Sequence, residues 1–169
     1  MKENFDLAFH ALLKHEGGFG IHPKDPGGMT NLGVTKRAWE DYVGHTVTEA
    51  EMRALTPDTV KAFYRESYWN AIGGDSLPGG VDYCCLDCAV NSGPRQAIKF
   101  LQRAVKVTDD GILGSGTRAA ITDTDSRLII SRITASRLDF LQKLPTFTTF
   151  GKGWVRRVRE VETLANSLA

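Results

Sequence analysis

One short segment near the start of the chain limits the folds that this sequence can adopt. Residues 17–33 contain six glycines and two prolines, a density that disfavours helix and favours short strands joined by turns. Much of the rest has the 3.6-residue periodicity of amphipathic helices; residues 4–16, for example, place Phe5, Phe9 and Leu12 on one face. The pattern therefore predicts a mainly α protein with one small β-hairpin over residues 19–35, near its N-terminus.

Start and stop signals divide the remainder into helices. Thr48-x-x-Glu51 has the pattern of a capping box, and Thr56-Pro57 has that of an N-cap followed by proline at the first helical position. Short helices are expected after Thr35, after Thr48 and after Ser115 or Thr117. Longer helices are expected over residues 4–16, 57–70, 81–92, 94–105, 126–144 and 152–168.

The composition excludes several classes of protein. With 41% hydrophobic and 24% charged residues among 169, the chain is neither disordered nor collagenous. No apolar run approaches the roughly 20 residues of a membrane helix, and no signal peptide is visible. We therefore expect synthesis in the cytoplasm without a signal peptide.

The charge is distributed unevenly along the chain. Residues 1–94 carry a net charge of −5 and residues 95–169 a net charge of +6, which together give the total of +1. This asymmetry favours either a polyanionic partner for the second half or two solvated faces of opposite sign. The basic residues form no compact stripe, so nucleic acid is not an expected partner.

Three cysteines, Cys84, Cys85 and Cys88, lie close together. An odd number in a cytoplasmic chain indicates free thiols. Cys85 and Cys88 form a CxxC pattern, but no second CxxC and no histidine pair accompany it, so small buried side chains on a helix are a better interpretation than zinc. The sequence has no metal-ligand cluster, phosphate loop or nucleotide fingerprint, and we expect no cofactor.

Glu16 is the residue that most suggests chemistry. At 100° per residue it falls within about 20° of Phe5 on the helical wheel, which places it on the apolar stripe in the last turn of the predicted helix. Desolvation and the negative end of the helix dipole would both raise the pKa of a carboxyl there. A carboxylic acid that stays protonated near neutral pH can protonate the leaving oxygen in a glycosidase. The alternative is a buried glutamate bonded to the backbone or to an arginine.

A second carboxylate, Asp25, follows nine residues later, and a hydroxyl follows at Thr30. Paired carboxylates suit glycoside hydrolysis, in which one acts as acid and the other as base or stabiliser. Asp25-Pro26-Gly27-Gly28 is also an ordinary turn sequence, so these residues alone leave both interpretations open.

The stretch HEGGFGIHPKDPGGMTNLGVT, residues 15–35, resembles the signature of glycoside hydrolase family 108, lysozyme-like N-acetylmuramidases common among phage endolysins. Four later stretches resemble the predicted peptidoglycan-binding region that adjoins this catalytic region. They are FYRESYW (63–69), LDCAVNSGPRQAIKFLQRAV (86–105), DDGILGSGT (109–117) and KGWVRRV (152–158).

The resemblance implies a lysozyme-like α+β fold with a small N-terminal β-hairpin lobe and a helical C-terminal lobe. It implies a catalytic region over residues 1–92 and a helical peptidoglycan-binding region over residues 93–169, packed as one compact unit. The implied activity is hydrolysis of the β-1,4 bond between N-acetylmuramic acid and N-acetylglucosamine, with Glu16 as the catalytic acid. Asp25 and Thr30 resemble the remainder of a Glu/Asp/Thr trio in related phage lysozymes, although Thr30 lies one residue closer to Asp25 than in that trio. An endolysin of this kind acts on the periplasmic cell wall after release through a separate pore former.

Five further residues are candidates for binding the sugar chain. Phe19 and His22 follow the helix that carries Glu16. Tyr68 and Asn70 end a helix, and Asn91 lies at a helix terminus where an amide can bond an acetamido group. Each is also suited to packing or capping.

The last predicted helix has an apolar stripe opposite a basic face that contains Lys152, Arg156 and Arg159. This is the pattern of an ordinary docked helix, or of weak contact with anionic peptidoglycan or lipid. We expect a monomer. A lytic transglycosylase that acts on the same bond and a non-catalytic wall-binding module remain as alternatives to the hydrolase.

Overall fold

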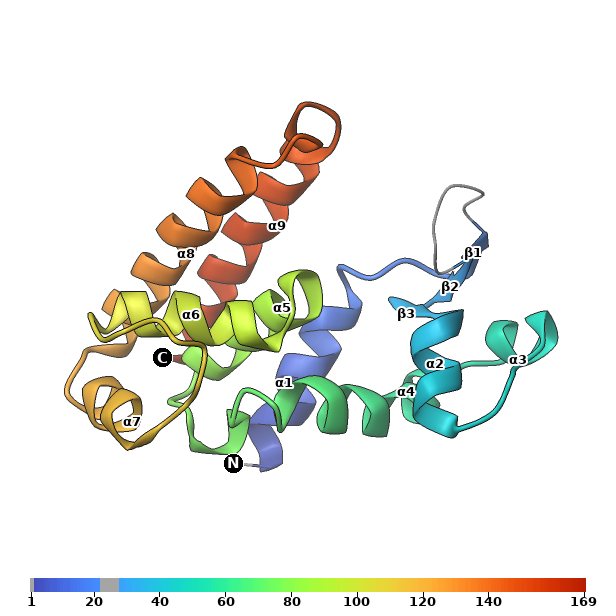
Figure 1. Ribbon diagram of the computed structural model, residues 1–169, viewed down its shortest axis with the longest axis horizontal. Coiled ribbons are helices and arrows are strands. Elements are labelled where there is room, and N and C mark those ends of the chain that lie inside the picture. Colours follow the sequence, from blue (N-terminus) through green and yellow to red (C-terminus); the bar gives the residue numbers. More distant parts are fainter. Residues whose placement is uncertain (1, 22–27) are drawn as a thin grey trace. The chain divides into compact units, whose positions relative to one another are not determined.

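The structure is a computed structural model in which residues 2–21 and 28–169 are described (Figure 1). The chain forms two compact units. The hairpin unit comprises Phe9–Ser67, and the helical unit comprises residues 1–8 together with Tyr68–Ala169. Helix α1 (Lys2–Leu13) begins in the helical unit and ends in the hairpin unit. No helix of the described residues is long and apolar enough to cross a membrane.

Three short strands form an antiparallel sheet in the hairpin unit. They are β1 (Gly20–Ile21), β2 (Met29–Asn31) and β3 (Val34–Thr35), with β2 in the middle. The sheet occupies the glycine-rich segment, and helices make up most of the other described residues. The predicted mainly α fold with one small β region is therefore confirmed.

The turn between β2 and β3 depends on glycine. Asn31 pairs with Val34, which leaves only Leu32 and Gly33 in the turn, with φ angles of 51° and 77°. Positive φ at both central positions is the signature of a type I′ turn, whose twist matches that of the strands it joins. Leucine rarely adopts such a φ, whereas glycine does so without a steric penalty.

Threonine caps begin the helices that follow the sheet. Thr35 caps α2 (Lys36–Val43), Thr48 caps α3 (Glu49–Arg53), and Thr56 caps α4 (Pro57–Tyr64). The last two caps are reciprocal, since the third residue of each helix bonds back to the cap backbone. These starts agree with the sequence prediction. Beyond α4 the chain continues as a π-helical turn, Arg65–Trp69.

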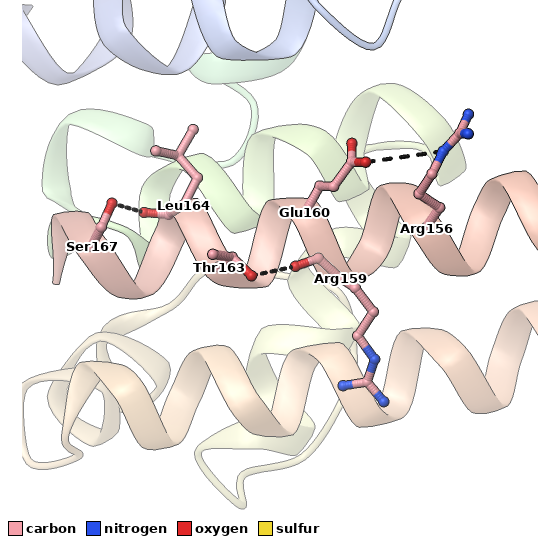
Figure 2. Close-up of a pocket in the computed structure, with 6 residues that line it drawn as sticks. All are labelled: Arg156, Arg159, Glu160, Thr163, Leu164 and Ser167. Atoms are coloured by element: carbon pink, nitrogen blue, oxygen red, sulfur yellow. Dashed lines mark hydrogen bonds and ion pairs between the residues drawn. The ribbon is translucent and has the colours of Figure 1, made fainter.

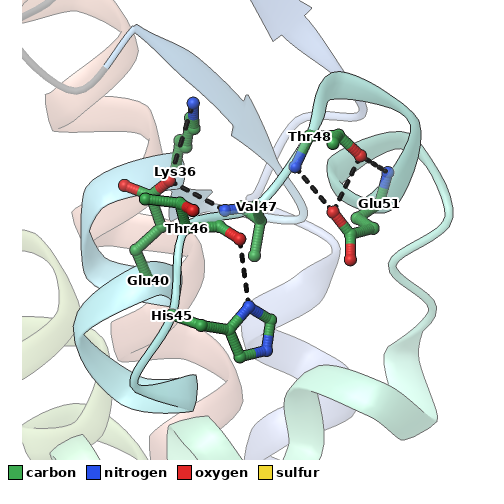
Figure 3. Close-up of polar contacts among 7 residues, drawn as sticks. All are labelled: Lys36, Glu40, His45, Thr46, Val47, Thr48 and Glu51. Carbon is green, nitrogen blue, oxygen red and sulfur yellow. Dashed lines mark hydrogen bonds and ion pairs between the residues drawn. The ribbon is translucent and has the colours of Figure 1, made fainter.

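Side-chain hydrogen bonds hold the loop between α2 and α3 (Figure 3). The carboxylate of Glu40 accepts a hydrogen bond of 2.9 Å from the amide of Val47 and lies 3.5 Å from Lys36 Nζ. The carboxylate of Glu51 accepts bonds of 2.7 Å from both the amide and the hydroxyl of Thr48. The loop that leads into α3 is therefore ordered by contacts from both helices.

Aromatic rings and one buried amide form the interior of the hairpin unit. Trp39 of α2 lies 6.0 Å from Phe63 of α4, ring centroid to centroid, and Phe9 of α1 lies 5.6 Å from Tyr64. The buried Asn31 side chain donates a 2.8 Å hydrogen bond to the carbonyl of Met52 in α3. The middle strand is thereby tied to α3.

The helical unit is built around α5. The unit contains α5 (Val81–Ser92), α6 (Pro94–Ala104), α7 (Ser115–Thr122), α8 (Ser126–Gln142) and α9 (Phe147–Leu168). Every residue of α5 from Val81 to Ala89 is buried, and α5 contacts α6, α8 and α9. Helices α8 and α9 lie side by side as an antiparallel pair (Figure 1).

A buried ion cluster joins three of these helices. Asp87 of α5 is fully buried. Its Oδ1 accepts a 2.9 Å hydrogen bond from Nε of Arg157 in α9 and lies 2.8 Å from Nη2 of the same guanidinium. Its Oδ2 lies 2.6 Å from Nη1 of Arg137 in α8, an ion pair without good hydrogen-bond geometry. Burial alone would raise the pKa of Asp87, but the two guanidiniums outweigh it and hold the pKa below its usual range.

The three cysteines are free and buried on α5, as predicted. Cys84 and Cys88 are one helical turn apart and share a hydrogen bond, which raises the pKa of Cys84. Among the residues that the structure describes, no group of three His, Cys, Asp or Glu side chains is placed to hold a metal ion.

Several predicted helix ends were wrong. The first helix ends at Leu13 rather than at 16, the helix predicted to 144 ends at Gln142, and the last helix begins at Phe147 rather than at 152. The two glycines after Glu16 and the proline at 145 let the chain leave the helix earlier than the apolar periodicity indicated. The predicted division into a catalytic region, 1–92, and a wall-binding region, 93–169, concerns function and stays a prediction.

Candidate functional site

Glu16 lies just beyond α1, not in the last turn of a longer helix as predicted. After Leu13 the backbone tightens, and the amide of Glu16 donates a 3.2 Å hydrogen bond to the carbonyl of Leu13, three residues earlier. Tightened turns of this kind are common at helix C-termini. The side chain is half-buried. Glu16 is thus carried by a short turn between α1 and the sheet.

The carboxylate of Glu16 rests against the β2–β3 turn at Gly33. A Cβ placed on Gly33 would lie 2.6 Å from Glu16 Oε2, and it would also lie 2.6 Å from the hydroxyl of Tyr64. Carbon atoms do not approach oxygen so closely without a shift of one partner. Gly33 is therefore required twice, by its φ of 77° and by the space that Glu16 and Tyr64 occupy.

Tyr64 links α4 to this turn. Its buried side chain donates a 2.8 Å hydrogen bond from the hydroxyl to the carbonyl of Leu32. The bond satisfies a carbonyl in the strained part of the turn, where Leu32 has positive φ. Three separate segments, the turn after α1, the β2–β3 turn and α4, thus meet at Gly33.

The predicted residues Thr30 and Phe19 lie in the same unit as Glu16. Thr30 is in the middle of β2, paired with Gly20 and Thr35, and is half-buried. Phe19 is also half-buried, and the guanidinium carbon of Arg53 lies 3.8 Å from its ring centroid. Cation–π contacts of this geometry hold an arginine over a ring. One face of Phe19 is therefore occupied by Arg53.

The other predicted residues are placed differently. Asp25 and His22 lie outside the described residues. Tyr68 is half-buried in the π-helical turn. Asn70 is exposed and directly follows that turn, and Asn91 is exposed in the last turn of α5. All three residues belong to the helical unit. The structure therefore groups Glu16, Phe19 and Thr30 in one unit and Tyr68, Asn70 and Asn91 in the other.

Sequence reasoning missed Gly33, Tyr64 and Arg53. Leu32-Gly33, the dipeptide before Val34, weakly indicated a tight turn, since glycine in a two-residue turn between strands favours type I′ geometry. Tyr64 and Arg53 carried no signal for this site. Their contacts with Leu32 and Phe19 join residues far apart in sequence, and only the tertiary fold brings them together.

A shallow hollow of about 470 Å³ lies on α9, and its lining includes Arg156 and Arg159 of the predicted basic face (Figure 2). Its polar side chains bond within α9 itself. The hydroxyls of Thr163 and Ser167 donate to the carbonyls of Arg159 and Leu164, at 2.9 and 2.6 Å, and Arg156 lies 3.9 Å from Glu160. Because these groups are engaged with their own helix, the hollow has little with which to orient a polar substrate.

Comparison with known proteins identifies relatives of the chain. The family model for Glycosyl hydrolase 108 matches residues 9–93, a span that contains every predicted site residue. The solved structure of Brucella abortus SagA is 43% identical in sequence, with a TM-score of 0.90, and the match covers 99% of this chain and 97% of that chain. No curated protein matches the chain. The similarity to a solved structure thus extends over both units.

Proposed function

Because the chain belongs to glycosyl hydrolase family 108, we propose that it cleaves the β-1,4 bond between N-acetylmuramic acid and N-acetylglucosamine in bacterial peptidoglycan. Membership of the family makes the chain a glycoside hydrolase with a lysozyme-like role on peptidoglycan. What we propose is which bond the protein cuts and which of its residues cut it.

Glu16 acts in this proposal as the general acid. Its carboxyl proton passes to the glycosidic oxygen as the bond from that oxygen to the sugar C1 breaks, and water supplies the hydroxyl that C1 gains. The observation that carries the assignment is the place of the Glu16 carboxylate. It rests on Gly33, where a side chain would collide with it, beside a turn that Tyr64 holds in position. A general acid needs such a fixed geometry relative to the bond it protonates.

Asp25 and Thr30 complete the proposed chemistry. Asp25 is the base that accepts a proton from the attacking water, or the carboxylate that stabilises positive charge at C1. Thr30 lies on β2, three residues before Gly33, and its hydroxyl is proposed to orient that water. The support for both roles is the spacing of the three residues and the family match over residues 9–93. Asp25→Asn, compared with wild type in the assay below, tests the first role, because removing a general base costs a factor on the order of 10²–10⁴.

Phe19, His22, Tyr68, Asn70 and Asn91 remain proposed contacts for the sugar chain. All five lie within the residues that the family model matches. The contact between Arg53 and Phe19 leaves at most one face of that ring for stacking on a sugar. Separate alanine variants should raise KM more than they lower kcat if the residues bind substrate without taking part in the chemistry.

The proposal is tested by measuring how fast purified sacculi lose turbidity after addition of the wild-type protein or the Glu16→Gln variant. The amide keeps the shape of the carboxylate, so the variant should melt like wild type while its rate falls by a factor on the order of 10²–10⁴. Asp41→Asn is the matched control, because Asp41 is an exposed carboxylate on α2 of the same unit. Its rate should equal that of wild type.

The products distinguish the alternatives. Hydrolysis adds one water to each cut, whereas a lytic transglycosylase releases an anhydro sugar of lower mass, and mass spectrometry of the muropeptides separates the two. A folded Glu16→Gln variant that keeps more than a tenth of the wild-type rate would remove Glu16 from the role of acid. Binding to sacculi without release of any soluble muropeptide would exclude catalysis on this polymer.

We also propose the biological setting, that of a phage endolysin which reaches the periplasmic wall through a separate pore former. The support is the resemblance of residues 15–35 to the signature of endolysins. Expression in bacteria with and without a pore-forming protein tests it, since lysis should require both.

A further inference from the structure

The end of the α8–α9 pair carries an aromatic surface that the proposed reaction does not use. Three rings gather in the first turns of α9: Trp154 lies 6.4 Å from Phe147 and 5.9 Å from Phe150, ring centroid to centroid. We call these three residues the aromatic tip. Phe150 is 54% exposed, among the most exposed large apolar side chains of the described residues.

The backbone of α9 supports this arrangement. Gly151 is buried, and a Cβ at this position would lie 2.8 Å from three ring atoms of Phe147. Phe147 therefore packs directly against the helix backbone. Phe150, on the neighbouring turn, stays exposed beside Trp154, which is half-buried. The aromatic tip is therefore a packed cluster of three rings rather than a single exposed ring.

The tip lies at the free end of the helix pair. Arg157 is held by Asp87 of α5, so α9 is packed against the body of the helical unit from that residue onward. Figure 1 shows the connection between α8 and α9 at the end of the pair that projects beyond α5 and α6. Within the helical unit, the aromatic tip is thus presented outward.

The charged residues nearest the tip in the sequence are basic. Residues 140–159 contain five basic side chains and no acidic one. Arg157 pairs with the buried Asp87, and three others have acidic partners: Lys143 with Asp139, Arg156 with Glu160 and Arg159 with Glu162. Lys152 is exposed and lies between Phe150 and Trp154 in the sequence. A cationic surface with exposed aromatic rings is complementary to an anionic interface.

We propose that the aromatic tip docks the protein on the surface of a bilayer that contains anionic phospholipid. Aromatic rings flanked by lysine and arginine enter the headgroup region of a bilayer, where the ring is desolvated and the cation meets phosphate. A carbohydrate partner fits less well. Residues 143–155 contain no Asp, Asn, Glu, Gln or His, and these are side chains that fix the orientation of a polar ligand through hydrogen bonds. The proposal is independent of the proposed hydrolase activity.

Cosedimentation of the full-length protein with vesicles tests the proposal. Vesicles of one part phosphatidylglycerol to three parts phosphatidylcholine should bind the protein, and pure phosphatidylcholine should bind it much less. Phe150→Ser and Lys152→Glu should each weaken binding by about tenfold, since one removes half-exposed aromatic surface and the other reverses a charge. Ile112→Ser is the matched control, because Ile112 is 66% exposed elsewhere in the helical unit, and it should bind as wild type does.

Tryptophan fluorescence identifies the surface that touches the lipid. Trp39 and Trp69 are buried, at 8% and 0% exposure, so quenching by brominated phosphatidylglycerol should come from Trp154. Binding without quenching, or binding that Phe150→Ser leaves unchanged, would overturn the proposal. So would an absence of binding to anionic vesicles. Loss of sacculus binding in Phe150→Ser with unchanged vesicle binding would assign the tip to the wall, and a dimer that Phe150→Ser dissociates would assign it to a second copy. Circular dichroism and melting of each variant show that it is folded.

Discussion

At the scale of single residues, Gly33 connects backbone conformation with the proposed chemistry. Its φ of 77° is one that other residues adopt only with strain, and its missing side chain leaves space for the carboxylate of Glu16. A second glycine of the same unit separates these two requirements. Gly44, at the end of α2, has a φ of 79°, but a Cβ there would have no atom within 4 Å.

We therefore predict different outcomes for Gly33→Ala and Gly44→Ala. Both variants introduce left-handed strain that should lower the free energy of unfolding by roughly 1–2 kcal/mol. Gly33→Ala should lose more, because its Cβ also meets Glu16 and the hydroxyl of Tyr64. Only Gly33→Ala should also displace Glu16, and a displacement of about 1 Å can lower a rate on the order of 10²-fold. Denaturant melts measure the first effect and sacculus turbidity the second. Equal rates for the two folded variants would show that the contact with Gly33 does not position Glu16.

At the scale of elements, the ion cluster of Asp87, Arg137 and Arg157 determines how α5, α8 and α9 respond to acid. The folded protein holds the pKa of Asp87 below its usual value of about 3.9, so the unfolded chain binds this proton more readily than the folded one does. The stabilisation of the folded state by this lowered pKa is fully present above the pKa that Asp87 has in the unfolded chain. It is lost as the pH falls from about 4 through the lower pKa of the folded state.

Asp87→Asn should accordingly destabilise the protein at neutral pH by about 3–5 kcal/mol, because it leaves two guanidiniums without their carboxylate. The difference from wild type should shrink as the pH falls below about 4, because Asp87 is then protonated first in the unfolded wild-type chain and, at lower pH, in the folded protein as well. Urea melts at neutral pH and at several pH values below 4 measure both effects. The control is Asp139→Asn, which removes an exposed pair with Lys143 and should change stability by less than about 1 kcal/mol. A constant difference between Asp87→Asn and wild type across this range would contradict the assignment.

At the scale of the whole molecule, the three cysteines report on global unfolding. Cys84, Cys85 and Cys88 are all buried on the central helix of the helical unit, and burial raises the pKa of Cys85, which disfavours its reactive thiolate. The thiols should become accessible to a reagent only when the helices around α5 separate.

Thiol titration with Ellman's reagent should therefore count three reactive groups in denaturant and none on the same timescale in the native protein. Ala119→Cys is a positive control, because Ala119 is exposed on α7 and a thiol there should react at once. Rapid reaction of any native thiol, at a rate independent of denaturant, would indicate local opening of α5 instead.

The sequence by itself determined the features that depend on neighbouring residues. Six glycines and two prolines in residues 17–33 excluded a helix and located the sheet, and the threonines at 35, 48 and 56 located three helix starts. Capping and turn preferences act over three or four residues, so the local pattern is sufficient to predict them. The motif around Glu16 likewise pointed to glycoside hydrolysis before any contact was known.

Only the tertiary structure decided which groups surround Glu16 and which charges are buried. Glu16 and Tyr64 come from different elements, and nothing in either segment predicts that both lie against Gly33. Asp87 read as a residue of an apolar helix; its role depends on Arg137 and Arg157, which lie 50 and 70 residues further along the chain. Contacts of this kind arise when helices pack, and packing depends on the shapes and charges of whole surfaces rather than on the periodicity of one segment.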